Sequence, residues 1–132
     1  MAYAQWVIIA IKPLGFILTI KNCRKQCGKF YKGDKDIEIP TSEIERHEVC
    51  PGEKFQISAC GRAHAPEGTE GAFDLYHGEK YIGNYFWSCP WGSKTNKSVM
   101  TKGSEEYLVE VTGANIDSGA LGNVCIKVVN IG

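Results

Sequence analysis

Apolar and polar side chains alternate in short runs along much of this chain. Phe73 and Leu75 flank the polar Asp74, and residues 107–112 read Tyr-Leu-Val-Glu-Val-Thr, with tyrosine and valine at every second position. Because successive side chains of a strand point to opposite faces, a period of two is typical of half-buried β-strands. The pattern predicts strands that turn one face toward a core.

The apolar stretch at residues 6–20 is interrupted by Lys12, Pro13 and Gly15. A membrane-spanning helix needs about 20 consecutive apolar residues, so this stretch is too short and too broken to be one. Val and Ile dominate residues 7–11, and β-branched side chains pack well on a pleated sheet. We therefore expect two strands joined by a turn.

The rest of the chain continues in short β-rich runs separated by turn residues. The expected strands include residues 55–58, 72–76, 81–89, 107–112 and 124–131. No window of helical length carries an apolar stripe with recognisable caps, and no linker or repeat divides the chain. About eight to ten short strands predict an all-β fold, a single-domain β-sandwich of two mainly antiparallel sheets over residues 1–132.

Composition and charge narrow the function classes. The 132 residues are 43% hydrophobic and 23% charged, which is typical of a globular protein and not of a disordered one. Lys plus Arg and Asp plus Glu are equal at 15 each, so no net charge favours nucleic acid as a partner. No basic segment precedes the first apolar run, so we expect no signal peptide and a soluble protein, cytoplasmic or secreted by a non-classical route.

The chain has six cysteines, at positions 23, 27, 50, 60, 89 and 125. An even count is compatible with disulfides in a secreted protein, but free thiols are also common small core residues. The paired Cys-x-x-Cys ligands that usually hold zinc are absent, so we expect no metal. The pairing and redox state of the cysteines stay open.

An aromatic strand leads into a polar loop at residues 85–96, which read Tyr-Phe-Trp-Ser-Cys-Pro-Trp-Gly-Ser-Lys-Thr-Asn. Trp91 falls on the loop, where it has no core to enter. Tryptophan favours the membrane–water boundary and its face attracts ammonium groups, while Lys94 and loop amides suit a phosphate. Tyr85 and Trp87 share one strand face and are either further ligand contacts or core residues of a central strand.

Residues 61–71 form a second loop, which carries His64, Glu67 and Glu70 among glycines. No motif orders these groups for acid–base chemistry, and no nucleophile elbow, P-loop or metalloprotease helix occurs. The acidic residues 33–36 lack the ligand spacing of an EF-hand and are interpreted as a turn. We expect neither an enzyme nor a cofactor.

Several motifs together resemble the aegerolysin family nearly end to end. They are residues 2–8 (Ala-Tyr-Ala-Gln-Trp-Val-Ile), 33–36 (Gly-Asp-Lys-Asp), 59–62 (Ala-Cys-Gly-Arg), 67–69 (Glu-Gly-Thr), 73–75 (Phe-Asp-Leu), 89–96 (Cys-Pro-Trp-Gly-Ser-Lys-Thr-Asn) and 117–122 (Asp-Ser-Gly-Ala-Leu-Gly). The resemblance implies a β-sandwich that recognises sphingolipids at membrane surfaces, either sphingomyelin with cholesterol or ceramide phosphoethanolamine. It also implies a partner of the perforin-like (MACPF) class, which inserts while the aegerolysin docks.

The resemblance further assigns residues to the site. It implies that Glu67 governs lipid selectivity and that Trp6, Trp91 and Lys94 face the lipid. The chain departs from the family pattern at Cys27, where many relatives have tryptophan before Gly-Lys, and at residues 97–99, where another tryptophan is usual. Cys23, Cys50 and Cys125, like Cys27, are additional to the cysteines that are usual in the family.

Two hypotheses follow. The first is a peripheral membrane-binding cytolysin subunit that docks on sphingolipid membranes and leaves insertion to its partner, because no hairpin carries the long alternating apolar pattern that insertion requires. Oligomerisation on the membrane is compatible with it. The alternative is a soluble carbohydrate- or protein-binding sandwich without lytic activity, since a fold alone does not fix function.

Overall fold

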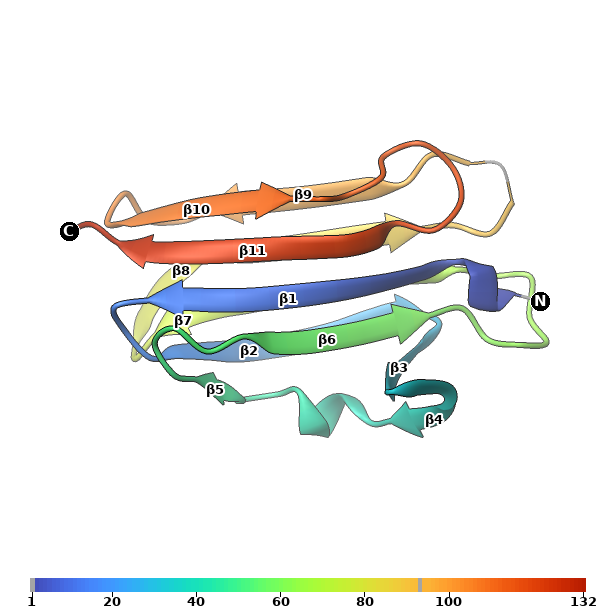
Figure 1. Cartoon of the computed structure of the whole chain (residues 1–132), viewed down its shortest axis with the longest axis horizontal. Coiled ribbons are helices and arrows are strands. Elements are labelled where there is room, and N and C mark those ends of the chain that lie inside the picture. Colours follow the sequence, from blue (N-terminus) through green and yellow to red (C-terminus); the bar gives the residue numbers. More distant parts are fainter. Residues whose placement is uncertain (1, 93) are drawn as a thin grey trace.

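A computed structural model describes residues 2–92 and 94–132, which fold into two β-sheets packed face to face (Figure 1). Two short 3-10 turns, η1 (Ala2–Ala4) and η2 (Thr41–Glu43), accompany the strands. The strands are β1 (Trp6–Leu14), β2 (Leu18–Cys27), β3 (Lys29–Lys32), β4 (Asp34–Ile39), β5 (Glu48–Val49), β6 (Phe55–Cys60), β7 (Thr69–His77), β8 (Lys80–Cys89), β9 (Lys97–Lys102), β10 (Tyr107–Thr112) and β11 (Gly122–Asn130).

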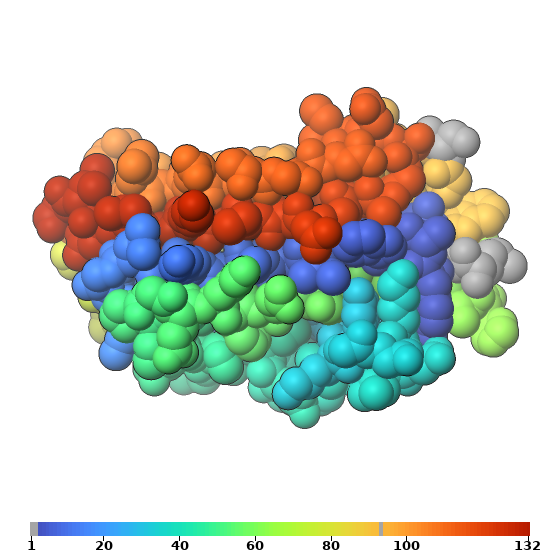
Figure 2. Space-filling model, in the orientation of Figure 1, coloured from blue at the N-terminus to red at the C-terminus, as the bar shows by residue number. Residues whose placement is uncertain are grey.

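The first sheet has the order β10-β11-β1-β6-β3-β4 and the second has the order β5-β2-β7-β8-β9. Every described pair of neighbouring strands is antiparallel except β1 and β11, which are parallel. Figure 2 shows the outer face of the first sheet, which runs from the orange and red side chains of β10 and β11 through the blue of β1 to the green of β6. The predicted sandwich of two mainly antiparallel sheets is confirmed.

The core lies between the sheets and follows the alternation in the sequence. In β1, Val7, Ile9 and Ile11 are fully buried while their neighbours are partly exposed, and β7 buries Phe73 and Leu75 on either side of the half-buried Asp74. A period of two places every second side chain on the inner face, where burial of apolar surface stabilises the fold. In β10, Tyr107 is buried and Val109 and Val111 are half-buried, whereas the residues between them are exposed. The half-buried strands predicted around Phe73 and at residues 107–112 are therefore confirmed.

The apolar stretch at residues 6–20 forms β1 and the start of β2, separated by a turn at residues 15–17. Gly15 has a φ of 89°, a left-handed conformation that glycine adopts without strain. The predicted pair of strands is confirmed. Over residues 2–92 and 94–132, no helix is long and apolar enough to cross a membrane.

The strands at residues 29–32, 34–39, 48–49 and 97–102 were not predicted. Three of them, β4, β5 and β9, are at sheet edges. β4 and β9 are largely exposed on both faces, so polar residues are tolerated on either side, and β5 is only two residues long. β3 has two neighbouring strands but is only four residues long. None of these four strands has a long buried face, so their sequences do not show the alternation of apolar and polar residues from which a strand could be predicted.

Candidate functional site

A hollow of about 210 Å³ opens at the end of the sandwich where β7 begins and β8 ends. Residues 66–70 line it together with Pro90, Trp91 and Lys94, and Cys27 and Ser88 complete the lining. The two loops that the sequence singled out therefore meet at one place. They do so because antiparallel pairing of β7 with β8 brings the end of one loop beside the start of the other.

The close approach of the two loops depends on Gly68. A Cβ atom at this position would collide with the carbonyl oxygen of Cys89, so only glycine lets the first loop press against the end of β8. In the adjoining ladder Thr69 is paired with Cys89, which continues the contact into the sheet. One wall of the hollow is thus fixed to the body of the sandwich.

The other wall is anchored through Asn96, which is buried. Its backbone N–H donates to the carbonyl oxygen of Asp117 at 2.9 Å, and its side-chain Nδ2 donates to the carbonyl oxygens of Asn115 at 2.9 Å and Gly119 at 3.0 Å. These bonds tie the segment that carries Lys94 to the loop before β11. The binding loop is held at its C-terminal end.

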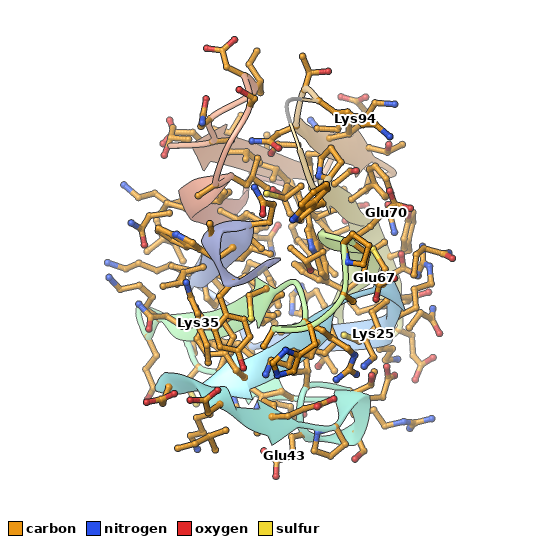
Figure 3. All side chains as sticks on the ribbon, turned by 90° about the vertical axis from the view of Figure 1, so that its right-hand side faces the viewer. Lys25, Lys35, Glu43, Glu67, Glu70 and Lys94 are labelled. Carbon is orange, nitrogen blue, oxygen red and sulfur yellow. The ribbon has the colours of Figure 1, made fainter. Side chains whose placement is uncertain are left out.

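Three of the predicted site residues, Glu67, Trp91 and Lys94, lie together at the hollow. Trp91 keeps 42% of its surface exposed, although it is a large apolar side chain. Figure 3 looks onto this end of the molecule and shows Glu67, Glu70 and Lys94 on the same side. Their proximity fits a single binding site, and their role in lipid binding stays a prediction.

Tyr85 and Trp87 are corrected to core residues. Both have 0% exposure, because their shared face of β8 is the inner face of the second sheet. The indole Nε1 of Trp87 donates to Thr69 Oγ1 at 3.1 Å, so this residue supports the hollow from behind. The Tyr85 hydroxyl pairs with Ser98 Oγ at 2.8 Å, and burial raises the pKa of Tyr85 to about 12. A side chain without exposed surface cannot touch a lipid, so the core alternative is the right one for both.

Trp6 is half-buried and does not line the hollow. Lys35 Nζ lies 5.6 Å from the centre of its indole ring and donates to the carbonyl oxygen of Tyr3 at 2.7 Å. Figure 3 shows Lys35 on the side opposite Glu67 and Glu70. Any contact of Trp6 with lipid would be made apart from the hollow, and it stays a prediction.

Sequence reasoning missed a row of polar side chains that crosses three strands on the outer face of the second sheet. Cys27 on β2 is paired with Glu70 on β7, and Glu70 is paired with Ser88 on β8. Ser88 Oγ donates to Glu70 Oε1 at 3.0 Å. Glu70 stood within the second loop of the sequence analysis, but only the strand register shows that its side chain lines the hollow.

The hollow contains charges of both signs. Among the residues that the structure describes there, Glu67 and Glu70 are acidic and Lys94 is basic. Burial raises the pKa of Cys27, and the negative charges of Glu67 and Glu70 raise it further, so the thiol stays protonated at neutral pH. Over the described residues, no group of three or more His, Cys, Asp or Glu side chains could hold a metal ion.

A larger hollow, of about 550 Å³, lies where β6 faces the β4–β5 connection. Its lining includes Phe55 stacked on His47, with ring centres 3.8 Å apart, and the apolar Ile39 and Ile44. It is larger, but no residue predicted for the site reaches it. Volume does not decide between the two, and we assign the candidate site to the smaller hollow because an exposed tryptophan and charges of both signs converge there.

The six cysteines are free thiols. Cys23, Cys60 and Cys89 are buried, and Cys89 Sγ donates to the carbonyl oxygen of Gly119 at 3.2 Å. Burial raises the pKa of Cys23 to about 12, and the neighbouring Glu45 carboxylate contributes to the shift. In this structure none of the six cysteines is paired in a disulfide, and burial keeps the thiols of Cys23, Cys60 and Cys89 from reacting readily.

The fold and the hollow together define an all-β sandwich with an exposed tryptophan and charges of both signs gathered in a hollow at one end. The aegerolysin family profile matches residues 4–131. Ostreolysin A6 from Pleurotus ostreatus is 45% identical over 100% of this chain and 99% of its own length, and Asp-hemolysin from Aspergillus fumigatus is 41% identical over 96% and 94%. The crystal structure of IP-1A from Alcaligenes faecalis has a TM-score of 0.92 at 39% identity and covers 99% of this chain and 94% of that one.

The chain belongs to the aegerolysin family. Its relatives place it among hemolysin-like proteins that bind membrane lipids.

Proposed function

We propose that this chain recognises sphingolipid head groups at a membrane surface, either ceramide phosphoethanolamine or sphingomyelin with cholesterol, through the hollow between residues 66–70 and 90–94. The observation that carries the proposal is the exposed Trp91 beside Glu67 and Lys94. A zwitterionic head group needs a partner for its ammonium and another for its phosphate, and this hollow offers both. The family membership supports the same class of ligand.

Each of the three residues has a distinct role in this proposal. The Glu67 carboxylate attracts the ammonium, and the Lys94 ammonium attracts the phosphate. Trp91 combines an apolar body with one N–H donor, so it rests at the boundary between acyl chains and water. The half-exposed indole would lose further surface to the bilayer when the protein docks.

The protein docks and does not insert. Its two sheets bury their inner apolar faces against each other, and opening the sandwich would expose that core. A docking subunit therefore needs a second protein to breach the bilayer, and the family resemblance points to a MACPF partner for a bicomponent cytolysin. Several docked copies would gather such partners at one place on the membrane.

Co-sedimentation with vesicles tests lipid recognition. We expect retention on vesicles of sphingomyelin with cholesterol or of ceramide phosphoethanolamine, and none on phosphatidylcholine alone. Trp91→Ala should weaken binding at least tenfold, which corresponds to about 1.4 kcal/mol, because the variant lacks the aromatic side chain that becomes buried on docking. Glu67→Gln should weaken it as well or change the preferred lipid.

Matched controls keep this test specific. Leu108 is 55% exposed on β10, away from the hollow, so Leu108→Ala should bind as the wild type does. Wild-type protein that stays in the supernatant with every vesicle would refute the proposal and would turn attention to glycans. Docking without insertion predicts that the bound protein alone releases no calcein from the same vesicles.

A further inference from the structure

The hollow contains more negative charge than a neutral zwitterion requires. Glu67 and Glu70 both line it, whereas Lys94 is the one basic residue among the lining residues that the structure describes. One carboxylate is enough to balance an ammonium group, and one lysine is enough for a phosphate monoanion. Balancing the ammonium charge therefore does not explain the presence of the second carboxylate, Glu70.

Glu70 is held in place from the neighbouring strand. Ser88 is directly opposite it in the β7–β8 ladder, and Ser88 Oγ donates to Glu70 Oε1 at 3.0 Å. Opposite residues in a ladder have Cβ atoms about 5 Å apart, so Ser88 lies close to Glu70 and restricts the conformations of the Glu70 side chain. Within the described parts of the chain, no side chain or backbone group donates to Oε2 of Glu70. Ser88 thus anchors one carboxylate oxygen of Glu70, and among the described residues the other oxygen has no donor.

Glu70 also borders the floor of the hollow on its other side. Its partner across the β2–β7 ladder is Cys27, and the charge of Glu70 is close enough to raise the pKa of the Cys27 thiol. Cys27 itself lines the hollow, so the carboxylate sits between two lining residues, Cys27 and Ser88. Its negative charge therefore acts on a neighbouring residue of the same hollow.

The two kinds of ammonium head group need different surroundings. A primary ammonium carries three N–H donors, which carboxylate and hydroxyl oxygens accept. A trimethylammonium has no N–H donor and is bound chiefly by the faces of several aromatic rings. Among the described lining residues the hollow offers two carboxylates and the Ser88 hydroxyl, but Trp91 is the one aromatic side chain.

We propose that Glu70, positioned by Ser88, is a specificity-determining residue that makes this hollow prefer a primary ammonium head group to a trimethylammonium one. This inference rests on the proposed function, because it takes the same hollow as the lipid site. Glu67 and Glu70 accept from two N–H donors of the ammonium, and Trp91 covers its apolar side. A trimethylammonium in the same place would leave the oxygens of Glu70 desolvated and without a donor.

Two sphingolipids that differ in the head group alone test the proposal. Binding is measured to vesicles that carry ceramide phosphoethanolamine or sphingomyelin at equal content in the same background of phosphatidylcholine and cholesterol. The wild type should bind the ethanolamine vesicles at least tenfold more tightly. Glu70→Gln keeps the shape of the side chain and removes its charge, so it should lower binding to ethanolamine vesicles about tenfold and leave binding to choline vesicles nearly unchanged.

Two further variants sharpen the result. Ser88→Ala frees Glu70 without removing its charge and should reduce the preference by a smaller factor. Glu110 is exposed on β10 outside the hollow, so Glu110→Gln is a charge-matched control and should leave the preference unchanged. Titration with free phosphoethanolamine and phosphocholine, followed by amide shifts of residues 67–70 in NMR spectra, gives the same comparison without a membrane.

The outcomes separate this inference from the proposed function. If the wild type binds neither vesicle, the proposed function fails and this inference fails with it. If the wild type binds vesicles but Glu70→Gln changes both affinities equally or not at all, the role of Glu70 is refuted while lipid binding stands. A wild type that prefers choline vesicles also refutes it.

Discussion

Tyr85, Trp87 and Trp91 lie within seven positions of one another but occupy two different environments. Tyr85 and Trp87 are fully buried on the inner face of β8, whereas Trp91, beyond the end of that strand, keeps 42% of its surface exposed. Chemical type does not distinguish them, because all three have an apolar ring and one polar handle. Their position in the backbone distinguishes them. Tyr85 and Trp87 lie within a strand, where every second side chain faces the core, and Trp91 lies beyond the end of that strand.

The buried hydroxyl of Tyr85 predicts a loss of stability at alkaline pH. Burial raises its pKa from 10.0 to about 12, so the unfolded chain ionises first. This contribution is fully present below pH 10 and is lost as the pH rises toward 12, by roughly 1.4 kcal/mol per pH unit at most. The free energy of unfolding, measured in urea between pH 8 and 11.5, should fall over this window.

Tyr85→Phe isolates that contribution. The variant loses the bond to Ser98 and starts from a lower stability, but its free energy of unfolding should fall less steeply above pH 10 than that of the wild type. Cys23 has a raised pKa in both proteins, so its effect cancels in the comparison. Equal slopes for the two proteins would contradict the assignment.

At the scale of elements, the β7–β8 hairpin organises the site. Its strands place Glu70 opposite Ser88 on the outer face, and its open end carries both loops of the hollow. The loops are less regular than the strands, but Gly68 and Asn96 attach them to the sandwich. A binding site on loops keeps its geometry when such contacts fix both ends.

The anchor at Asn96 can be tested by Asn96→Ala. The change removes two hydrogen bonds from Nδ2 to backbone carbonyl groups and should lower the free energy of unfolding by about 2 kcal/mol, because each bond contributes about 1 kcal/mol and the carbonyls lose their donor. It should also weaken vesicle binding, since the segment carrying Lys94 loosens. Asn123, exposed on β11, is the matched control, and Asn123→Ala should change neither quantity.

Unchanged stability of Asn96→Ala would show that the loop before β11 is held by other contacts. Normal stability combined with weak vesicle binding would instead place Asn96 within the binding surface, and would contradict its role as an anchor.

At the scale of the whole molecule, β1 is the structural centre of the first sheet. It pairs with β11 on one side and β6 on the other, and its inward side chains are fully buried. The edge strands β4 and β9 have one ladder partner each and largely exposed side chains. Local opening should therefore cost least at the edges and most at the centre.

Hydrogen exchange followed by NMR tests this gradient. The amides of Ile9 and Ile11 should exchange through global unfolding, with protection equal to the full free energy of unfolding measured in urea. Amides of β4 and β9 should exchange at least tenfold faster. Protection in β4 equal to that in β1 would mean that the edge opens only with the whole sandwich.

The sequence by itself determined the strands with one buried face, the absence of helices of ordinary length and the loops that form the hollow. These features follow from local patterns, because alternation and turn residues act over a few neighbouring positions. The exposed position of Trp91 could be predicted in the same way, whereas Glu67 was singled out by the resemblance to the family. Their meeting in one hollow could not be predicted.

Tertiary structure decided what depends on strand order and register. The row of Cys27, Glu70 and Ser88 joins three strands that are up to 61 positions apart, and a shift of one residue in any strand would turn its side chain to the other face. The burial of Tyr85 and Trp87 follows from the opposing sheet, which no local pattern describes. A pattern with a period of two gives the two faces of a strand, but only packing decides which face is inside and which side chains it brings together.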